Sequence, residues 1–497
     1  MTAVVLGVDI GTTSTKVVAF APDGGERAAA EAGYELLEPE PGAAVQDPEA
    51  VLAAVTSAVR DAAAAARADG CEVAGLAFSS AMHGLLGVDE AGAPLTPLIT
   101  WADVRAADEA ERLRREHFEL HGATGTPLHP MSPLVKLCWL AGHEPSVFAR
   151  AARWAGLKEL LLARWAGDWV IDHSCASGTG MLDLRTLAWH PGALEVAGVR
   201  PEQLSRPVPV SELLSLGEAA AGELGLPEGL PLVIGGGDGP LANLGLGAVR
   251  PGVAACSIGT SGALRVVVEA PVTDPRGRVF CYALTPGRWV VGGAINNGGV
   301  VLEWAGDALA PDLGEHAEQE LLALAEQAPP GSDALLMLPY LLSERAPHWS
   351  ALPRGAYVGL TRAHRREHLV RAALEGVCQQ LAVVLTSVRD AGHEVTELRA
   401  TGGFARSGFW RQLLADVLGM EIGFPAGRES SAFGAALVGM EALGIGGSIE
   451  RAAELVTISE RLEPDPSAAA TYARQRETFA ALYDALVPAF TALRSQA

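Results

Sequence analysis

The stretch that decides the fold lies at the start of the chain: Val4-Val5-Leu6-Gly7-Val8-Asp9-Ile10-Gly11-Thr12-Thr13-Ser14-Thr15-Lys16-Val17-Val18-Ala19-Phe20. Two apolar, β-branched runs flank a small hydroxyl-rich turn, which predicts a β-hairpin. Its backbone N–H groups, hydroxyls and lysine ammonium suit phosphate oxygens. The residues predicted to bind phosphate here are Gly11, Thr12, Thr13, Ser14 and Lys16. Asp9 ends the first strand, where its carboxylate can hold Mg²⁺ directly or through water.

A weaker version of this pattern lies near the middle of the chain: Val253-Ala254-Ala255-Cys256-Ser257-Ile258-Gly259-Thr260-Ser261-Gly262-Ala263-Leu264-Arg265-Val266-Val267-Val268. Gly259 and Thr260 repeat the Gly-Thr pair of the first turn. Two ordinary hairpins with small turns are the alternative interpretation. Two phosphate-binding hairpins instead predict two related domains, residues 1–248 and 249–497, that close on one nucleotide.

The length and composition limit the function classes. A chain of 497 residues is too long for one core, and 49% hydrophobic with 19% charged residues is typical of a globular protein. The net charge of −22 disfavours nucleic acid as a partner, and it means that an anionic substrate needs a local basic pocket. Six cysteines without CxxC pairing, no leader pattern and no membrane-length apolar run favour a cytoplasmic protein. We expect small-molecule partners, neither nucleic acid nor a membrane, and a chain that could form a homodimer.

Two segments are predicted to face a substrate. A short buried strand at 73–78 delivers Met82, His83 and Gly84 near its carboxyl end, where open α/β sheets bind ligands. Trp101, Asp103 and Arg105 alternate along what we expect to be an extended segment, so all three would share one face and line one pocket. A solvated strand edge is the alternative.

The run Pro231-Leu232-Val233-Ile234-Gly235-Gly236-Gly237-Asp238 predicts a buried strand that ends in glycines, followed by a helix. The glycines let a substrate approach the backbone, and Asp238 is placed to accept a proton from a substrate hydroxyl. Helix capping is the commoner role for Asp at such a position. The helix N-terminus would keep this carboxylate ionised at neutral pH.

In the second half, a strand at 290–299 runs into a helix start at Gly299, and residues 398–407 predict a strand, a Gly402-Gly403 turn and a helix beginning near Ser407. Such a junction can seat the adenosine half of a nucleotide beside free N–H groups, although a routine βα turn is equally compatible. Apolar positions from Val370 to Val388 predict a core helix. Residues 27–46 are expected to be irregular, and 172–180 to form a small-residue loop.

The chain resembles the FGGY carbohydrate kinase family. The residues that fit its first signature are Met131, Pro133, Lys136, Leu137, Trp139 and Leu140. Those that fit its second are Gly355-Ala356-Tyr357-Val358-Gly359-Leu360, His368-Leu369 and Ala372-Ala373-Leu374-Glu375. The resemblance implies an α/β fold with two RNase H-like domains of the actin and hexokinase type. It also implies ATP and Mg²⁺ in the cleft, with Asp238 as the general base.

The resemblance leaves the sugar open. The residues at 82–84, 101, 103 and 105 match the xylulose, glycerol and gluconate branches alike, whereas the runs 124–136 and 173–178 look most like the gluconate branch. We therefore expect a kinase of D-gluconate, with xylulose as the alternative substrate. A gluconate carboxylate needs a cation, and the candidates are His83, Arg105, His129, Lys136 and Lys158. Lys136 and Lys158 are each expected to be ordinary surface charges.

Two other functional classes were weighed. The run His364-Arg365-Arg366-Glu367-His368 fits a short zinc peptidase pattern, but its arginines would repel a cation and it lies inside the second signature. An actin-like sugar sensor without activity would have lost the base or the phosphate lysine. Asp238 and Lys16 are both present, which disfavours a sensor.

Overall fold

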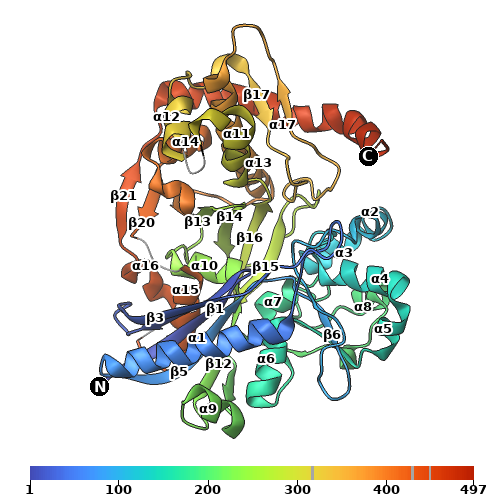
Figure 1. Cartoon of the computed structure of the whole chain (residues 1–497), viewed down its shortest axis with the longest axis vertical. Coiled ribbons are helices and arrows are strands. Elements are labelled where there is room, and N and C mark those ends of the chain that lie inside the picture. The colour runs from blue at the N-terminus through green and yellow to red at the C-terminus, as the bar shows by residue number, and fades with distance from the viewer. Residues whose placement is uncertain (315–317, 427–429, 447–448, 497) are drawn as a thin grey trace.

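Two mixed β-sheets, one above the other, form the centre of the molecule (Figure 1). The structure is a computed structural model that describes residues 1–314, 318–426, 430–446 and 449–496. The first sheet has the order β11-β12-β5-β1-β2-β3, from Leu213–Ser215, Pro231–Gly237, Cys71–Ser80, Thr2–Ile10, Ser14–Phe20 and Glu26–Gly33. The second has the order β15-β16-β14-β13-β19-β20-β21, from Phe280–Thr285, Arg288–Ile295, Gly262–Val268, Val253–Ile258, Glu397–Thr401, Ile422–Pro425 and Ile458–Leu462.

The two sheets repeat one topology. In the first, β1 and β2 form an antiparallel hairpin, β3 extends it, and β1 lies parallel to β5. In the second, β13 and β14 form the hairpin, β16 extends it, and β13 lies parallel to β19. Both predicted hairpins are therefore present, and each lies inside its sheet with a paired strand on either side. The repeat confirms the predicted α/β fold with two RNase H-like sheets.

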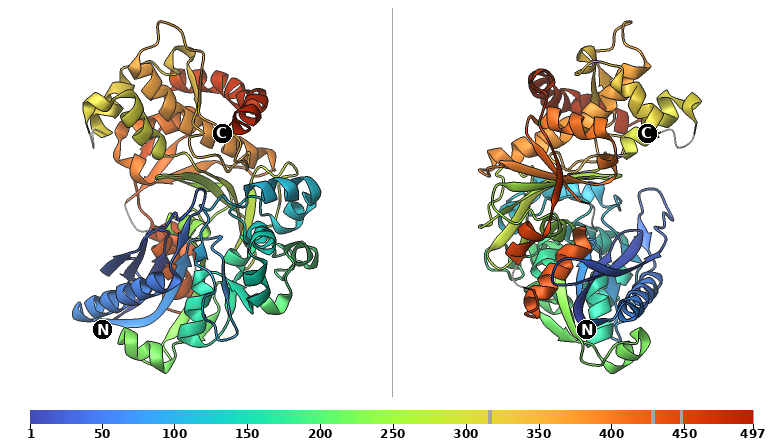
Figure 2. Two further views of the ribbon diagram at one scale, coloured as in Figure 1. Left: turned by 45° about the vertical axis from the view of Figure 1, so that its right-hand side comes forward. Right: turned by 90° about the vertical axis from the view of Figure 1, so that its left-hand side faces the viewer.

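Two helices connect the sheets. Helix α10 (Asp238–Gly245) follows β12, and helix α15 (Ser430–Ala442) lies against it between the two sheets (Figures 1 and 2). Although α15 belongs to the second half of the sequence, it packs on β1 and β5 of the first sheet. The backbones come so close that a Cβ on Gly7 would lie 2.1 Å from the carbonyl oxygen of Ala432. Glycine at position 7 is therefore required for this packing, and the predicted boundary at 248/249 falls just after α10.

A helical region between β5 and β12 lies beside the sheets (teal in Figure 1). Its helices are α2 (Ala107–Glu116), α3 (Glu119–Thr124), α4 (Pro133–His143), α5 (Pro145–Arg150), α6 (Leu157–Ala166), α7 (His173–Ser177), α8 (Pro191–Ala197) and α9 (Glu218–Leu224). It also contacts the second sheet, because the Cys281 N–H donates to the Gly125 carbonyl at 2.9 Å and the Ala283 N–H donates to Ser177 Oγ at 3.1 Å. Strand β15 is thus tied to the first half of the chain.

The other helices pack around the sheets. They are α1 (Pro48–Ala68), α11 (Val300–Leu309), α12 (Glu318–Glu326), α13 (Arg366–Asp390), α14 (Gly408–Leu418), α16 (Ala452–Leu455) and α17 (Pro466–Arg494). Short strands are β4 (Val45–Gln46), β6 (Leu86–Val88), β7 (Leu98–Ile99), β8 (Arg153–Ala155), β9 (Val170–Asp172), β10 (Arg206–Val208), β17 (Leu336–Leu338) and β18 (Ala356–Val358). By length and composition α13 could cross a membrane, but 83% of its most apolar window is buried in the protein. It is the predicted core helix.

Two local predictions were wrong. The segment 27–46 is irregular only in part, because residues 27–33 belong to edge strand β3 and residues 45–46 to the short strand β4. The Glu-Arg-Ala-rich sequence of β3 lacks the β-branched residues that usually mark a strand. Residues 173–177 form helix α7 instead of a loop, because the Asp172 carboxylate accepts from the Cys175 N–H at 2.8 Å and caps the helix.

Candidate functional site

The first hairpin presents a carboxylate and an ammonium at its tip. Asp9 and Lys16 are direct cross-strand partners in β1 and β2. Ser79 Oγ, on the neighbouring β5, donates to Asp9 Oδ1 at 2.7 Å. Carboxylate and hydroxyl oxygens are the hard donors that Mg²⁺ prefers, so this donor set fits the metal predicted at Asp9.

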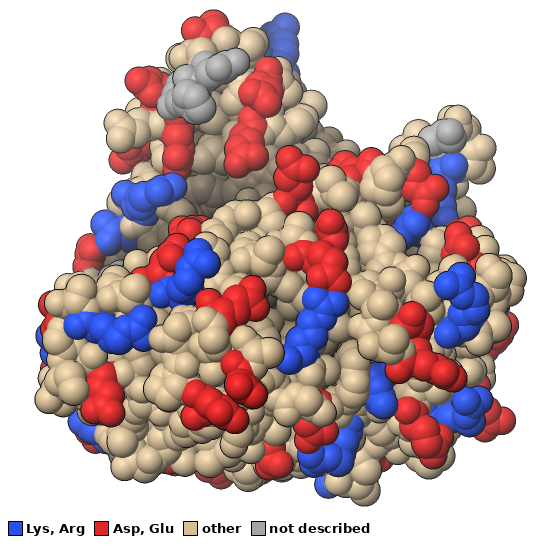
Figure 3. All heavy atoms as spheres, turned by 60° about the horizontal axis from the view of Figure 1, so that its bottom comes forward, with Lys and Arg blue, Asp and Glu red and all other residues tan. Residues whose placement is uncertain are grey.

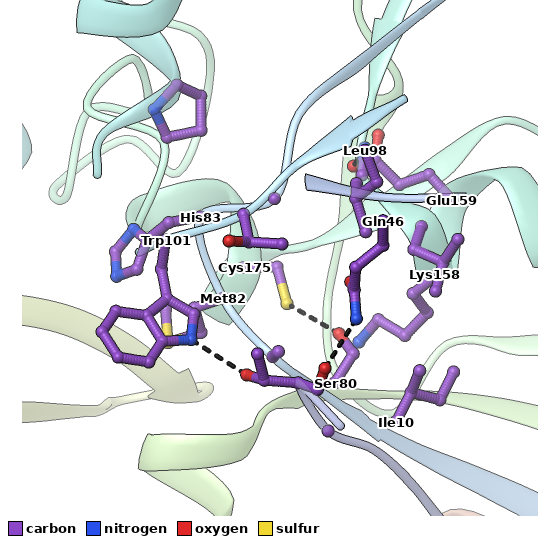
Figure 4. Close-up of a pocket in the computed structure, with 18 of the residues that line it drawn as sticks. Ile10, Gln46, Ser80, Met82, His83, Leu98, Trp101, Lys158, Glu159 and Cys175 are labelled. Atoms are coloured by element: carbon purple, nitrogen blue, oxygen red, sulfur yellow. Dashed lines mark hydrogen bonds between the residues drawn. The ribbon is translucent and has the colours of Figure 1, made fainter. Parts of the chain in front are cut away.

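Side chains from three other segments brace the first turn. The Tyr34 hydroxyl donates to the Gly11 carbonyl at 2.7 Å, and Gln46 Nε2 donates to the Thr12 carbonyl at 2.6 Å. Trp101 Nε1 donates to Thr12 Oγ1 at 2.9 Å (Figure 4). The turn that is predicted to bind phosphate is therefore connected directly to the predicted sugar side through Trp101.

The second hairpin borders a cavity of about 870 Å³, within the size range of small-molecule sites. Gly259, Thr260, Gly299 and Gly403 line it. Gly402 lies behind the lining, with a φ of +114° and a Cβ position only 2.2 Å from the Ile258 carbonyl. Ser407 caps α14 by accepting from the Trp410 N–H at 3.2 Å. The structure thus brings the predicted nucleotide residues of the second half together at one cavity.

A second pocket lies in the first half of the chain (Figure 4). Met82, His83, Gly84 and Trp101 line it together with Gly11 and Thr12 of the hairpin. Other polar residues that line this pocket carry no recognisable signal in the sequence, and they include Gln46, Ser80, Glu159 and Cys175. Burial lowers the pKa of His83 to about 3, so this imidazole is neutral. It cannot supply the cation that was expected of it.

The predicted shared face of Trp101, Asp103 and Arg105 was wrong. The chain turns after Thr100, so these residues do not alternate along a strand. Asp103 is buried and accepts from the Ala44 N–H at 3.1 Å, while Arg105 pairs with Asp103 at 2.8 Å and with Glu40 at 2.7 Å. Only Trp101 of the three lines the described pocket. Asp103 and Arg105 hold the loop behind it.

Lys136 and Lys158 are both buried, contrary to the expectation of surface charges. Lys136 Nζ donates to the carbonyls of His83 at 2.6 Å, Thr100 at 2.7 Å and Ile99 at 3.2 Å. It thereby fixes the two segments that carry His83 and Trp101, and His83 is held at a φ of +67°. Lys158 pairs with Asp172 at 2.6 Å. The sequence could not reveal these partners because they lie far away along the chain.

Asp238 is the first residue of α10, and Gly237 occupies the N-cap position that the capping interpretation assigned to Asp238. A Cβ on Gly237 would lie 2.6 Å from Met82 Cγ, so the strand end that carries Asp238 packs against the predicted sugar side. Burial raises the pKa of Asp238, whereas Arg265, the Gly239 N–H, Arg345 and Lys158 favour its charged form. The expectation that the helix N-terminus alone would keep it ionised therefore misses the larger effect of burial.

Two arginines near Asp238 were not among the predicted site residues. Arg265 lies on β14, and Arg345 lies 4.7 Å over the Trp101 ring. The sequence did offer a signal, since Arg265 interrupts the apolar second strand of the second hairpin motif and Arg345 follows a strand in the run Ser343-Glu344-Arg345. The run 364–368, for which a zinc site was disfavoured, has protein partners at both histidines: His368 Nε2 lies 3.2 Å from Asp333 Oδ2, and His364 Nδ1 accepts from the Thr361 N–H at 2.9 Å.

Comparison with known proteins agrees with this geometry. Residues 4–245 match the N-terminal domain, and residues 254–443 the C-terminal domain, of the FGGY family of carbohydrate kinases. A gluconokinase of Bacillus subtilis is 40% identical over 95% of this chain and 94% of its own length. A xylulose kinase of Escherichia coli is 31% identical over 97% and 99%. A crystal structure of a gluconate kinase from Lactobacillus acidophilus superposes with a TM-score of 0.94 at 32% identity, over 99% of this chain and 100% of that one. The chain therefore belongs to the FGGY family of carbohydrate kinases.

Proposed function

We propose that this chain is a gluconokinase, which transfers the γ-phosphate of ATP to a hydroxyl of D-gluconate. The observation that carries the proposal is the position of Asp238 at the start of α10. It directly follows Gly237, which packs against Met82 on the sugar side, and it interacts electrostatically with Arg265 of the second hairpin. The similarity to the B. subtilis gluconokinase over nearly the whole chain supports gluconate as the acceptor. We further propose that the protein is cytoplasmic. It could act as a homodimer, and sedimentation velocity would measure its oligomeric state.

Phosphoryl transfer depends mainly on positioning and charge neutralisation, and the two hairpins supply both. Asp9 would hold Mg²⁺, which neutralises charge on the phosphates when bound. Lys16, Thr12, Thr13 and Ser14 would contact the β- and γ-phosphates from the first sheet, and Gly259 and Thr260 from the second. Gly299, Gly402, Gly403 and Ser407 would form the wall for the rest of the nucleotide.

Asp238 would orient the accepting hydroxyl and remove its proton as the bond to phosphorus forms. A carboxylate with a raised pKa is a stronger base than an exposed one, so the burial of Asp238 suits this role. Met82, Gly84, the neutral His83 ring and Trp101 would hold the carbon chain of the sugar, while Asp103 and Arg105 support that loop from behind.

A coupled ADP-release assay over gluconate, xylulose, glycerol and ribulose tests the proposal. We expect the highest kcat/KM for gluconate. A higher kcat/KM for xylulose would instead support a xylulose kinase, the activity named for the E. coli relative. Asp238→Asn should lower kcat by about 10²- to 10⁴-fold, the usual contribution of a general base. An unchanged melting temperature would separate lost chemistry from lost fold. Full turnover in this variant would remove Asp238 from its role.

A further inference from the structure

A carboxylate substrate needs a cation, and the candidates found in the sequence are all unsuited. Burial lowers the pKa of His83 to about 3 and that of His129 well below its ordinary value, so both rings are neutral. Arg105 is paired with Asp103 and Glu40, Lys158 is paired with Asp172, and Lys136 binds three carbonyl oxygens. In a protein of net charge −22, the cation for gluconate must come from elsewhere.

Arg265 is a cation whose guanidinium has no hydrogen-bond or ion-pair partner in the part of the chain that the structure describes. It extends from β14 toward the start of α10, where a Cβ on Gly239 would lie 3.2 Å from Arg265 Nε. It is only partly buried, and among the residues that the structure describes no hydrogen bond or ion pair to its guanidinium is found. The buried Arg371 and Arg399, in contrast, each pair with a carboxylate and donate to a carbonyl oxygen. A guanidinium left open beside the candidate base is a ready site for an anion.

Tyr282 supplies an independent observation. Its side chain lies on β15, is only 2% exposed, and its hydroxyl has no hydrogen-bond partner among the described residues. The ring stacks on Phe280 at 4.3 Å and meets the edge of His83 at 5.8 Å, so the hydroxyl is held beside the sugar side. A buried hydroxyl without a partner destabilises a fold. A ligand oxygen at this place would satisfy it.

Arg345 completes the group and is rigidly placed. Its Nε donates to Asn296 Oδ1 at 2.6 Å and one terminal nitrogen donates to the Ile295 carbonyl at 3.0 Å, while the Trp101 ring lies 4.7 Å below the guanidinium. The charge of Arg345 acts on Arg265, Tyr282 and Asp238. Three groups from separate segments of the second half therefore converge next to the candidate base.

We infer that Arg265, Tyr282 and Arg345 form the subsite that binds the carboxylate of the sugar acid and selects it over neutral sugars. The inference rests on the proposed function and names the residues behind its specificity. A guanidinium can bind both carboxylate oxygens through parallel N–H donors, and the phenol adds a third donor. A neutral ketose would bring no carboxylate to the Arg265 guanidinium, for which no hydrogen bond or ion pair is found among the described residues.

The test compares Arg265→Met with Arg265→Lys. Titration calorimetry measures the Kd for D-gluconate without ATP, and kinetics give kcat/KM for gluconate and xylulose at alkaline pH, where Asp238 is ionised in each variant. We expect Arg265→Met to weaken gluconate binding about 100-fold, mainly through KM, with a much smaller effect on xylulose. Arg265→Lys should recover part of the loss. Equal losses of kcat/KM for gluconate and xylulose would mean that Arg265 acts on the transferred phosphate or on Asp238. That result would overturn the inference.

A matched tyrosine pair separates binding from folding. Tyr282→Phe removes an unsatisfied hydroxyl, so it should keep or raise the melting temperature while weakening gluconate binding about tenfold. Tyr340→Phe removes a hydroxyl that bonds Gln380 at 3.1 Å, so it should lower the melting temperature and leave the gluconate Kd unchanged. If the wild type ignores gluconate, the proposed function fails. If it uses gluconate and these Kd values do not move, only the inference fails.

Discussion

The two hairpins β1–β2 and β13–β14 share one position in their sheets but differ in what they carry. At the second cross-strand pair from the turn, the first hairpin has Asp9 opposite Lys16, whereas the second has Ser257 opposite Ala263. Side chains of Tyr34, Gln46 and Trp101 brace the first turn. The second turn is braced by backbone, since the N–H groups of Gly298 and Gly299 donate to the carbonyls of Thr260 and Gly259 at 3.0 and 2.6 Å.

This difference is consistent with different roles for the two hairpins in the proposed function. The first carries formal charges that would serve metal and phosphate, and the second carries neutral amides and hydroxyls in a backbone-braced turn. The second hairpin keeps its one cation, Arg265, farther along the strand and near Asp238. On the face shown in Figure 3, acidic and basic side chains are interspersed. Charge in the cleft is therefore a local feature, and single substitutions can test it.

The largest expected effect comes from the charged position of the first hairpin. Asp9→Asn should lower kcat/KM about 10²- to 10³-fold and raise the Mg²⁺ concentration needed for half-maximal rate, because it removes the carboxylate at the metal site. Ser257→Ala, at the matched position of β13, should change kcat/KM by less than about threefold. Steady-state kinetics over a Mg²⁺ series measure both. Similar losses of kcat/KM in Asp9→Asn and Ser257→Ala would contradict the proposed difference between the two hairpins.

The second hairpin should instead be sensitive to its backbone frame. In Gly298→Ala, the new Cβ would lie 2.6 Å from the Ser261 carbonyl and 2.7 Å from that of Gly259. We expect KM for ATP to rise about tenfold or more, and the free energy of unfolding to fall by about 1–3 kcal/mol, as for overpacked sites. Thermal melts and ATP kinetics measure these changes. Gly122→Ala is the control, since no atom lies within 4 Å of its Cβ position.

The contrast between hairpins also explains what the sequence could predict. The two hairpins, the core helix α13 and the strand–helix junction at Asp238 were predicted correctly, because each follows from a local pattern of apolar and small residues. The first hairpin's charges lie within a few residues of its turn, so Asp9 and Lys16 could be found directly. Edge strand β3 was missed because alanine and glutamate carry no strand signal.

Side chains whose partners lie far away along the chain could not be predicted. The burial of Lys136 depends on carbonyls at 83, 99 and 100, and that of Lys158 on Asp172. Arg345 reaches Trp101 only because the helical region contacts the second sheet. The sequence contains each of these residues, but only the fold shows which of the cations are already neutralised.

The acid limb of the pH profile sharpens the comparison, because its position depends on a cation of the second hairpin. The base must be ionised, so kcat/KM should fall as the pH drops through the raised pKa of Asp238. The groups that favour its charged form are Arg265, the Gly239 N–H, Arg345 and Lys158. Removing the positive charge in Arg265→Met should raise this pKa further, and the limb should move to higher pH for every sugar. A limb that stays in place would separate Arg265 from the base.

The smallest effect is expected where one brace of the first turn is removed. Tyr34→Phe deletes the hydroxyl that donates to the Gly11 carbonyl at 2.7 Å, and Gln46 and Trp101 still hold Thr12. Since burial raises the pKa of Tyr34 to about 12, the phenol keeps its proton throughout an assay range of neutral to moderately alkaline pH. One hydrogen bond of about 0.5–1.5 kcal/mol corresponds to a rise in KM for ATP of about two- to tenfold. No single side chain does the same work in the described second turn, whose brace is made of amides. A rise in KM for ATP as large as that of Gly298→Ala would therefore mean that both turns depend equally on the groups that brace them. The proposed difference between a charged first hairpin and a backbone-braced second hairpin would then not hold.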